Sequence, residues 1–330
     1  MVKSGKRKLI LLVLVLAGMS AIFIPGCSLK KLNSGEGPEA PRGYRSEFFL
    51  KAAYAIGRLD IIDMEPDIPP ELKVYSDVEY KKTDSLSLKL DIYRLQELTE
   101  PVPVVIFIHG GSWKSGKRSD YRPYLVDYAL KGYVTITVSY RLSKVAPFPA
   151  AVQDVFCAIR WVQDHAAEFG IDPGRVALAG ASAGAHLAMM AGYAAGDSLF
   201  NAGCNHESSV DVNAVVNFYG PVDLTVDFAR ESGPLKEFLG KSYDEAPYLY
   251  HIVSPYAYIT ADGPPTLTFH GTIDSIVPVS QADSLDTWLN RAGVIHEYHR
   301  LKGWPHAMDI EKTVNEYCQY YMDKFLERYL

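Results

Sequence analysis

The residue best suited to nucleophilic chemistry is Ser182, which stands at the centre of the sequence GASAG, residues 180–184. This G-x-S-x-G spacing follows a short apolar run that predicts a buried strand, and the small residues after it predict a helix. A serine at such a strand–turn–helix junction stands on a sharp turn, where glycines let strand and helix approach closely. The helix N-terminus also favours negative charge beside the serine. We therefore predict that Ser182 is a nucleophile.

A serine hydroxyl needs a base, and we predict that this base is His306. In the strand–turn–helix setting, the nucleophile is followed along the chain by an acid and then by a histidine. His306 stands in a turn, residues 302–306, between the last predicted strand and the last predicted helix. His296 and His299 fall within that strand, and His270 precedes the best acid candidate. His306 is thus the histidine whose place in the chain fits a base.

The acid expected to orient this base is Asp274, in the loop GTIDSIVP that follows a predicted strand. Asp283 belongs to the next helical pattern and Asp309 comes after His306, so neither fits the order. A carboxylate bonded to a histidine holds the ring in one tautomer and stabilises its charged form. Ser182, Asp274 and His306 are therefore the predicted catalytic residues.

A second glycine-rich motif, HGGSW at residues 109–113, follows the apolar run VVIFI and resembles the HGGG-type loop of lipases and esterases. We predict that the backbone N–H groups of Gly111, Ser112 and Ala183 form an oxyanion hole. Ser112 replaces the third glycine of the motif, which leaves the backbone donor in place. His109 is expected to orient the loop. Three nearby aromatic residues are candidates for lining the substrate pocket, with ordinary packing as the alternative for each: Trp113, Tyr219 and Trp304.

Strand and helix signals alternate along the chain from about residue 74, which predicts an α/β fold. Two segments with alternating polarity, residues 74–83 and 86–95, predict an antiparallel hairpin at the start. Continuous apolar runs, typical of strands buried on both faces, come next. Further strands are predicted at 103–109, 133–140, 175–180, 213–220, 265–271 and 294–301, and helices at 149–167 and 307–329. The sequence thus predicts about eight strands in a mostly parallel sheet, with helices on both faces and a short helical cap insertion at about 221–263.

Six motifs together resemble the hormone-sensitive-lipase-like esterases, and more nearly the bacterial carboxylesterases and feruloyl or acetylxylan esterases. They are HGGSW, YRL (140–142), FPAAVQD (148–154), GASAG, GTIDSIVP and the late WPH. The resemblance covers roughly residues 75–328 and implies an α/β-hydrolase fold, hydrolysis of carboxylic esters and no cofactor or metal. It also implies structural roles for Tyr140, Arg141 and Asp154. The short cap departs from the family pattern and argues against a large lipid-binding pocket.

Two other functions compete with an esterase. A serine peptidase of the prolyl-oligopeptidase kind carries a large extra domain, for which the stretch before residue 75 leaves no room. A non-catalytic binding protein on a hydrolase scaffold is disfavoured by the intact Ser182, Asp274 and His306. The expected substrates are short-chain, aryl or carbohydrate-linked esters, cleaved through an acyl-enzyme.

The N-terminus has the layout of a bacterial lipoprotein signal. Basic residues precede an apolar run, residues 9–24, which Gly26 and Cys27 follow. Cleavage before Cys27 and lipidation of that cysteine are expected, with the enzyme facing the periplasm or the cell exterior. Ser28 follows the cysteine in place of an acidic residue, which favours the outer membrane in a host that has one. An uncleaved anchor helix is the alternative, although the run of 16 residues is short for a bilayer of about 30 Å. The predicted parts are a signal peptide at 1–26, a flexible tether at 27–45 and the hydrolase domain at 46–330.

The charge of the chain bears on its binding partners, and the number of cysteines bears on disulfide pairing. Without residues 1–26 the chain keeps 29 Lys and Arg against 39 Asp and Glu, a net charge of −10. No basic stripe remains, so nucleic acid is not an expected partner. Three cysteines follow Cys27, and an odd number leaves at least one unpaired within a single chain. Cys157 and Cys318 lie in apolar helical patterns and are expected in the core, whereas Cys204 lies in a polar loop and is expected to be exposed.

Overall fold

The computed structural model describes residues 37–83 and 86–330. The predicted signal peptide, Cys27 and the first part of the predicted tether lie outside this part of the chain. Within the described residues, no helix combines the length and the apolar character that crossing a membrane requires. The expectations for export and lipidation therefore stay predictions.

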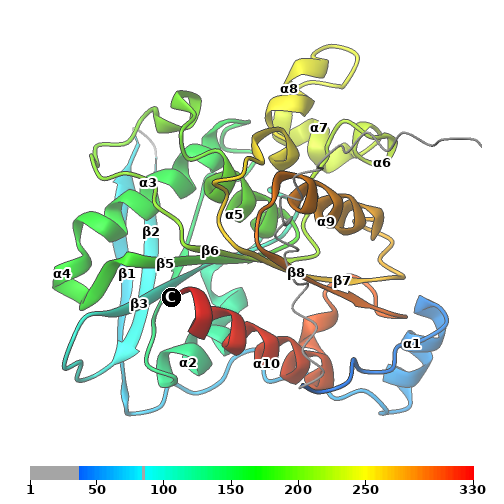
Figure 1. The fold of residues 1–330 in the computed structure, drawn as a ribbon, viewed down its shortest axis with the longest axis horizontal. Helices are drawn as coiled ribbons and strands as arrows, with labels where there is room; N and C mark the ends of the chain where they lie inside the picture. The colour runs from blue at the N-terminus through cyan, green and yellow to red at the C-terminus, as the bar shows by residue number, and fades with distance from the viewer. Residues whose placement is uncertain (1–36, 84–85) are drawn as a thin grey trace, which may run out of the picture. The chain divides into compact units, whose positions relative to one another are not determined.

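An eight-stranded sheet forms the centre of the described chain, in the strand order β1-β2-β4-β3-β5-β6-β7-β8 (Figure 1). Strand β2 pairs antiparallel with β1 and with β4, and the other neighbouring strands pair in parallel. The bounds are β1 Leu72–Lys82, β2 Ser87–Leu95, β3 Val102–Ile108, β4 Val134–Val138, β5 Ile171–Ala181, β6 Ala214–Phe218, β7 Thr266–Gly271 and β8 His296–Leu301. This arrangement is the predicted mostly parallel sheet, opening with a hairpin.

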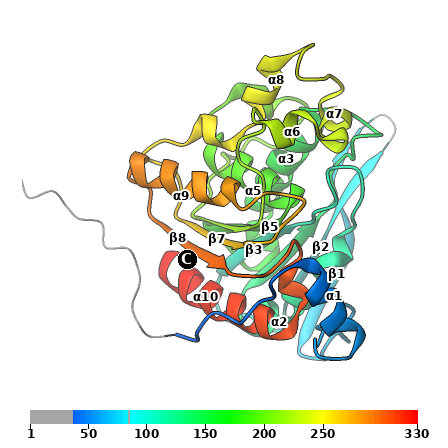
Figure 2. The ribbon, with the colours of Figure 1, turned by 90° about the vertical axis from the view of Figure 1, so that its right-hand side faces the viewer.

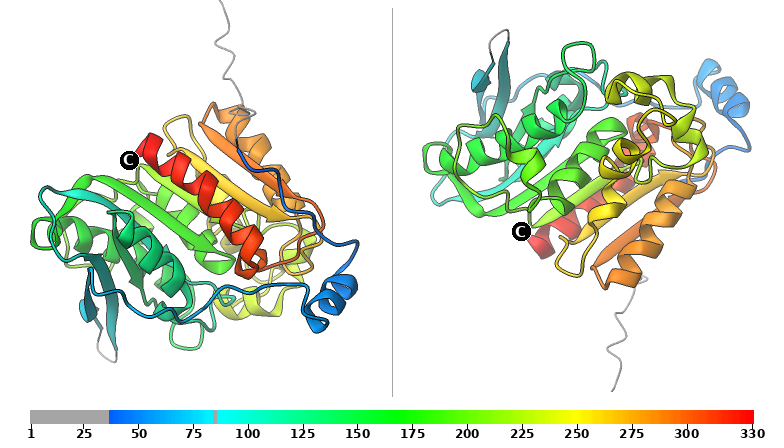
Figure 3. Two further views of the ribbon diagram at one scale, coloured as in Figure 1. Left: turned by 90° about the horizontal axis from the view of Figure 1, so that it is seen from below. Right: turned by 90° about the horizontal axis from the view of Figure 1, so that it is seen from above.

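Helices cover both faces of the sheet. Successive side chains of a strand point to opposite faces, and because the central strand β3 is apolar throughout, both of its faces are buried. In β3, Ile106 and Ile108 belong to a core shared with α3, α5 and α9, whereas Val105 and Phe107 belong to a core shared with α2 and α10. The two layers are seen from opposite sides in Figure 3. The helices are η1 Arg118–Tyr121, α2 Arg122–Leu130, α3 Ala150–Asp164, α4 Ala166–Phe169, α5 Ala183–Tyr193, η2 Ser198–Asn201, α9 Ser280–Ala292, η4 Met308–Ile310 and α10 Lys312–Tyr329.

The insertion between β6 and β7 consists of short helices. They are α6 Asp227–Arg230, α7 Gly233–Leu239, α8 Pro247–Ile252 and η3 Pro255–Tyr258. Helix α7 begins where the Ser232 side chain accepts a hydrogen bond from the Leu235 N–H, and it ends at Gly240, which has φ 70°. Figure 2 shows these helices gathered above the edge at which the parallel strands end.

Residues 37–45, the end of the predicted tether, lie against the domain. The Tyr44 N–H donates to the Gly303 carbonyl at 2.8 Å, and Trp304 Nε1 donates to the Pro41 carbonyl at 3.0 Å. The rings of Tyr44 and Trp304 meet edge-on, with their centroids 5.9 Å apart. Aromatic packing thus fixes a segment whose composition predicts a flexible tether, and contacts with the domain begin before the predicted boundary.

Helix α1 (Glu47–Ala55) was not expected from the sequence, and it presents apolar side chains to the surface. Ala53 is buried, whereas Phe48, Phe49 and Tyr54 are 73%, 53% and 60% exposed. Figure 1 shows α1 at the edge of the domain. Because its apolar residues do not gather on a core-facing side, their spacing predicts no amphipathic helix.

The cysteines differ from the expectation at one position. Cys157 on α3 forms a disulfide with Cys204, with their Cα atoms 5.4 Å apart, so Cys204 is a paired and half-buried residue. Cys318 is unpaired and buried in α10. The odd count predicted one unpaired thiol, but sequence alone did not show that the polar loop folds back onto α3.

Candidate active site

Ser182 stands on a strained turn between β5 and α5, with φ 54° and ψ −122°. Its N–H donates to the Phe218 carbonyl at 2.9 Å, which fixes the turn to the neighbouring strand. Both glycines of the motif are required by close packing. A Cβ on Gly184 would lie 1.9 Å from the Ile108 carbonyl oxygen, and one on Gly180 would lie 2.5 Å from the Gly184 backbone. The spacing therefore holds the serine at the carboxyl end of β5.

The loop after β3 turns sharply beside this serine. Gly111, Ser112 and Trp113 have positive φ values of 106°, 54° and 58°. Within the described residues, the N–H groups of Gly111 and Ser112 donate to no protein acceptor. The Ala183 N–H, in the first turn of α5, has no acceptor within its own helix. Ser112, Ser182 and Ala183 line one pocket, so these N–H groups are candidates for binding a developing oxyanion.

Buried polar side chains hold the base of the loop. The His109 ring stacks on Tyr140 with centroids 4.4 Å apart, and the Tyr140 hydroxyl donates to the His109 carbonyl at 2.9 Å. Asp154 is fully buried and accepts from Arg141 Nε at 2.7 Å and from Lys81 Nζ at 2.8 Å. Burial lowers the pKa of His109, which favours a neutral ring. These contacts agree with the structural roles expected for this group.

Asp274 and His306 are brought together at the same edge of the sheet. His306 Nδ1 lies 2.7 Å from Asp274 Oδ2, and Asp274 Oδ1 accepts from the N–H groups of Ile276 at 2.8 Å and Val277 at 2.9 Å. Burial opposes ionisation, but hydrogen bonds from two histidines and a backbone N–H outweigh it and hold the pKa of Asp274 well below its ordinary value. With Nδ1 donating to this carboxylate, Nε2 of His306 is left as a proton acceptor.

A second histidine, His270, contacts the same carboxylate. Its Nε2 lies 3.3 Å from Asp274 Oδ2 and 2.8 Å from the Val277 carbonyl oxygen, and its side chain is fully buried. Sequence order excludes His270 as the base because it precedes the acid, and the structure gives it a different place. His270 contacts both the carboxylate of Asp274 and the backbone of the loop that carries it. The spacing of residues in the sequence does not predict these contacts.

Tyr219 and Asp309 support His306 from the other direction. The rings of Tyr219 and His306 lie with their centroids 4.5 Å apart. The Tyr219 hydroxyl donates to the buried Asp309, and Tyr124 donates to the same carboxyl group at 3.3 Å. Burial raises the pKa of Asp309, and the tyrosine hydrogen bonds offset part of that effect. This cluster ties the loop after His306 to β6 and α2.

Ser182 and His306 are related through β6. The Ser182 N–H bonds to the last residue of β6, and the next residue, Tyr219, contacts the His306 ring. Val277, from the Asp274 loop, lines the same pocket as Ser182. Among the described residues no hydrogen bond joins Ser182 Oγ to His306. Such bonds are often long before substrate binds and tighten in the complex.

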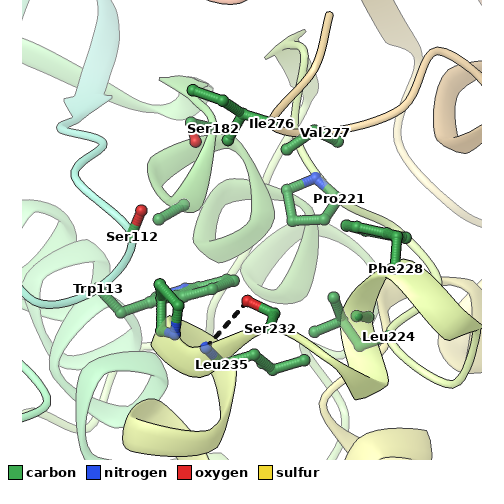
Figure 4. A pocket seen from close by; sticks show the side chains of 13 residues that line it. Ser112, Trp113, Ser182, Pro221, Leu224, Phe228, Ser232, Leu235, Ile276 and Val277 are labelled. Carbon is green, nitrogen blue, oxygen red and sulfur yellow. Dashed lines mark hydrogen bonds between the residues drawn. The ribbon is translucent and has the colours of Figure 1, made fainter.

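A pocket of about 80 Å³ lies in front of Ser182 (Figure 4). Its walls come from the loop after β3, the Asp274 loop and the insertion. The side chains from the last two include Pro221, Leu224, Phe228, Leu235, Ile276 and Val277. Figure 4 shows them facing a common space with Ser182 and Trp113. The insertion therefore closes the site to a small volume.

Trp113 is fixed as one wall of this pocket. Its indole stacks on Phe238 of α7, with ring centroids 4.7 Å apart and planes 6° apart. Trp113 Nε1 donates to His186 Nδ1 at 3.2 Å, and His186 Nε2 donates to the Val253 carbonyl at 2.7 Å. Burial lowers the pKa of His186 to about 4, so the ring is neutral and serves as donor on one side and acceptor on the other. The wall and the insertion are thus held by one buried histidine.

Comparison with known proteins identifies the family. Residues 90–289 match the protein family described as BD-FAE, which is more than half of the chain. The chain belongs to the BD-FAE family. The matched region contains Ser182, Asp274 and the loop after β3, whereas His306 lies beyond its end. The esterase LipC of Mycobacterium tuberculosis is 33% identical over 230 residues, which are 67% of this chain and 57% of LipC. The chain spans about half to two thirds of the length of the first curated relatives that it matches.

Solved structures share the fold of this BD-FAE member. A truncated form of a carbohydrate esterase from gut microbiota is 26% identical, with a TM-score of 0.68, and the match covers 78% of this chain and 95% of that one. The thermophilic esterase Est2 of the Planctomycetes species Thermogutta terrifontis is 28% identical, with a TM-score of 0.66, covering 83% and 96%. The predicted α/β-hydrolase fold and the predicted relation to carboxylesterases are confirmed, and the described residues form an esterase-type domain.

Of the three aromatic residues expected near substrate, only Trp113 lines the Ser182 pocket in this BD-FAE domain. Tyr219 is 3% exposed and packs behind His306, with its hydroxyl bonded to Asp309. Trp304 is 2% exposed beneath the segment that contains Tyr44. The contacts of Tyr219 are those of ordinary packing, whereas Trp304 also lines a second cavity together with His306. The sequence did not single out the pocket walls of the insertion, because its helices are too short for a periodic signal.

Proposed function

We propose that this chain hydrolyses carboxylic esters with Ser182 as nucleophile, His306 as base and Asp274 as the acid that orients the base. The observation that carries the proposal is the 2.7 Å contact between Asp274 Oδ2 and His306 Nδ1, at the sheet edge where Ser182 stands on its strained turn. Membership of the BD-FAE family and similarity to proteins described as esterases support it.

In the proposed mechanism, His306 Nε2 takes the hydroxyl proton of Ser182 as its oxygen attacks the ester carbonyl carbon. The N–H groups of Gly111, Ser112 and Ala183 bind the resulting oxyanion. The bond to the leaving oxygen then breaks, and His306 returns the proton to that oxygen to form the alcohol. Water attacks the acyl-enzyme with His306 again taking a proton, and the acid departs as the serine regains its hydrogen.

The pocket volume favours a short acyl group. The space in front of Ser182 measures about 80 Å³, whereas an apolar cavity of about 150 Å³ holds one benzene molecule. An acetyl or propionyl group therefore suits the site better than a long chain. We propose short-chain, aryl or carbohydrate-linked esters as substrates, and similarity to a carbohydrate esterase supports the last class.

We also propose that the enzyme is exported and held on a membrane surface by lipid on Cys27. The basic residues, the apolar run and the Gly26-Cys27 junction of the sequence support this location. The disulfide between Cys157 and Cys204 adds support, because disulfides form and persist mainly in oxidising compartments.

A panel of p-nitrophenyl esters and aminoacyl p-nitroanilides tests the activity with purified protein. We expect turnover of p-nitrophenyl acetate and propionate, and loss of that turnover in Ser182→Ala. Cleavage of the anilides in preference to the esters would identify a peptidase. Binding without turnover of either series would identify a non-catalytic binding protein on this scaffold.

A further inference from the structure

A groove of about 320 Å³ lies between α1 and the loop that contains His306. Side chains from α1, from the segment that follows it and from the His306 loop line the groove. They are mainly apolar, with Leu50, Ile61, Met308 and Ile310, and include the charged Lys51 and Glu311. His306 lines this groove but not the Ser182 pocket, and Ser182 lines its own pocket but not the groove. In Figure 2, α1 and the insertion helices lie on opposite sides of the edge where the strands end. The site thus has two separate cavities, the pocket lined by Ser182 and the groove lined by His306.

The outer wall of the groove is attached to both loops that carry the acid and the base. The Ser275 hydroxyl, next to Asp274, donates to Glu47 of α1. The Ile62 N–H donates to the Ile310 carbonyl at 3.0 Å, so the chain after α1 is tied to the loop that follows His306. This wall lies outside the region that matches the family, residues 90–289. It is a feature of this chain that the family match does not include.

The chemistry of ester cleavage assigns different parts of a substrate to the two cavities. The carbonyl carbon bonded to Ser182 carries the oxyanion, the acyl substituent and the leaving oxygen. Because His306 gives its proton to the leaving oxygen, that oxygen must lie at the imidazole. The acyl substituent then occupies the pocket beside Ser182 and Ala183, and the alcohol substituent continues past His306.

We infer that the groove beside α1 is the binding site for the alcohol part of the substrate, and that it takes an apolar alkyl or aryl alcohol. The inference rests on the proposed ester hydrolysis. His306 lines the groove, so a molecule bound there reaches the proposed base, and the mainly apolar lining gives the chemical class. Most of the lining, including Leu50, Ile61 and Met308, offers no hydrogen-bond donor or acceptor for the hydroxyls of a sugar. Two charged side chains also line the groove, but Glu311 accepts from Thr313 and Val314, and Lys51 donates to Glu47.

A series of acetate esters tests the inference, because the acyl part stays constant while the alcohol grows. Methyl, butyl and hexyl acetate are compared by kcat/KM, each divided by its rate constant for hydroxide hydrolysis to remove differences in intrinsic reactivity. Burial of one methylene is worth up to about fourfold in kcat/KM, so we expect hexyl acetate to exceed methyl acetate by about tenfold or more.

Two matched variants locate the effect. Ile61→Ser, in the groove, is expected to lower the hexyl-to-methyl ratio by about threefold or more. Ile56→Ser removes the same side chain from a position that is 66% exposed and outside the groove, and it should leave the ratio unchanged. A flat series in the wild type, or equal responses of the two variants, would overturn the assignment of the groove.

The remaining outcomes separate this inference from the proposed function. If methyl acetate is hydrolysed but the series is flat, the groove assignment is wrong and the esterase proposal stands. If no acetate is hydrolysed, the esterase proposal itself is wrong. If an acetylated methyl xyloside has a higher kcat/KM than hexyl acetate, the alcohol class is a polyol, and the apolar assignment is overturned.

Discussion

The backbone of Ser182 has a φ of 54°, a conformation that residues other than glycine rarely adopt. Such strain costs about 1–3 kcal/mol, and surrounding contacts must maintain it. The Ser182 N–H bonds to the Phe218 carbonyl, and the Ser182 carbonyl accepts from the His186 N–H at 3.0 Å. Close packing of Gly184 against β3 leaves no room for relaxation. The strained turn therefore fixes the hydroxyl at the site independently of substrate.

The first prediction concerns the pairing of Ser182 with His306. Single substitutions Ser182→Ala and His306→Ala should each lower kcat/KM for p-nitrophenyl acetate by about 10⁴-fold or more. The double variant should be little worse than either, because residues that act as one unit are not additive. Steady-state kinetics on the three purified variants, with circular dichroism to verify folding, measures this.

His299→Ala is the control for that experiment. His299 lies in β8 and bonds to Tyr317 and Glu297, away from the Ser182 pocket. A folded His299→Ala variant should keep its activity. Loss of activity in this variant together with its survival in His306→Ala would show that the base has been misassigned. Covalent labelling of Ser182→Ala by a fluorophosphonate would likewise contradict the assignment of the nucleophile.

The second prediction concerns pH and Asp274. Its folded-state pKa lies well below the ordinary value, so the carboxylate stays ionised as pH falls to about 4. The acid limb of kcat/KM should therefore show loss of activity with the uptake of a single proton by the enzyme. Ionised Asp274 also stabilises the fold above its unfolded pKa, and that contribution disappears as pH falls towards the folded pKa.

Asp274→Asn tests the same residue without a change of pH. An amide can donate to Nδ1 and so favours the wrong tautomer of His306, and we expect kcat to fall by about 10⁴-fold. A pH–rate profile from pH 4 to 9 gives the slope for the wild type. A two-proton acid limb would contradict a permanently ionised Asp274, and near-normal activity of Asp274→Asn would contradict its role.

The sequence was informative for residues whose chemistry depends on order along the chain. Ser182, Asp274 and His306 follow strand ends in a fixed order, and parallel strands bring their carboxyl ends to one edge. The pairing of Asp274 with His306 agrees with that prediction. The contacts of His270 and Asp309 depend on how two loops fold back, and residue order gives no information about that.

At the scale of elements, the insertion decides what reaches Ser182. Helices α6 and α7 supply Phe228 and Leu235 to a pocket whose opposite wall, Trp113, stacks on Phe238 of α7. Each of these helices has seven residues or fewer and is stabilised by packing on its neighbours more than by its own hydrogen bonds. The volume of the pocket is therefore determined by packing between short elements.

The third prediction follows from that packing. Phe228→Ala should enlarge the acyl pocket and shift the preference among p-nitrophenyl esters from acetate towards butyrate and hexanoate. We expect the hexanoate-to-acetate ratio of kcat/KM to rise by about tenfold or more, since a benzyl-sized space admits several methylenes. Tyr248→Ala, on α8 of the same insertion, is the control because Tyr248 is 64% exposed and outside the pocket. An unchanged ratio in Phe228→Ala would show that the acyl chain lies elsewhere.

Strands and helices could be predicted from the sequence where burial produces a regular spacing of apolar residues. The strands are apolar on both faces or alternate, and each predicted strand has a counterpart within a few residues. Helix α1 has no such signal, since Phe48 and Phe49 face solvent. The segment before it was expected to be a tether from its Pro, Gly and charged residues, yet Tyr44 and Pro41 pack against Trp304. Local composition does not reveal contacts with residues more than 250 positions away.

For the whole molecule, export and anchoring fit the other properties of the chain. The disulfide between Cys157 and Cys204 suits an oxidising compartment. The net charge of −6 in the full sequence concerns a different property, since it gives no reason to expect nucleic acid as a partner. Tyr321 donates to the Pro38 carbonyl at 3.3 Å, so the chain contacts the domain at a position about ten residues after Cys27. Ten extended residues reach about 35 Å at most. A lipid on Cys27 would therefore keep the enzyme close to the membrane surface.

The last prediction is that Cys27 carries this lipid. Acylation by two or more chains gives stable anchoring, since each buried CH₂ contributes about 0.8 kcal/mol. Esterase activity should therefore sediment with membranes in the wild type and resist washing with high salt, whereas Cys27→Ala should lose lipid labelling by a fatty-acid analogue. Mass spectrometry of the wild type should find an N-terminus at Cys27. If activity stays with membranes in both proteins and residues 1–26 remain attached, the N-terminus is an uncleaved anchor, because the apolar run at 9–24 then holds the enzyme without any modification of Cys27.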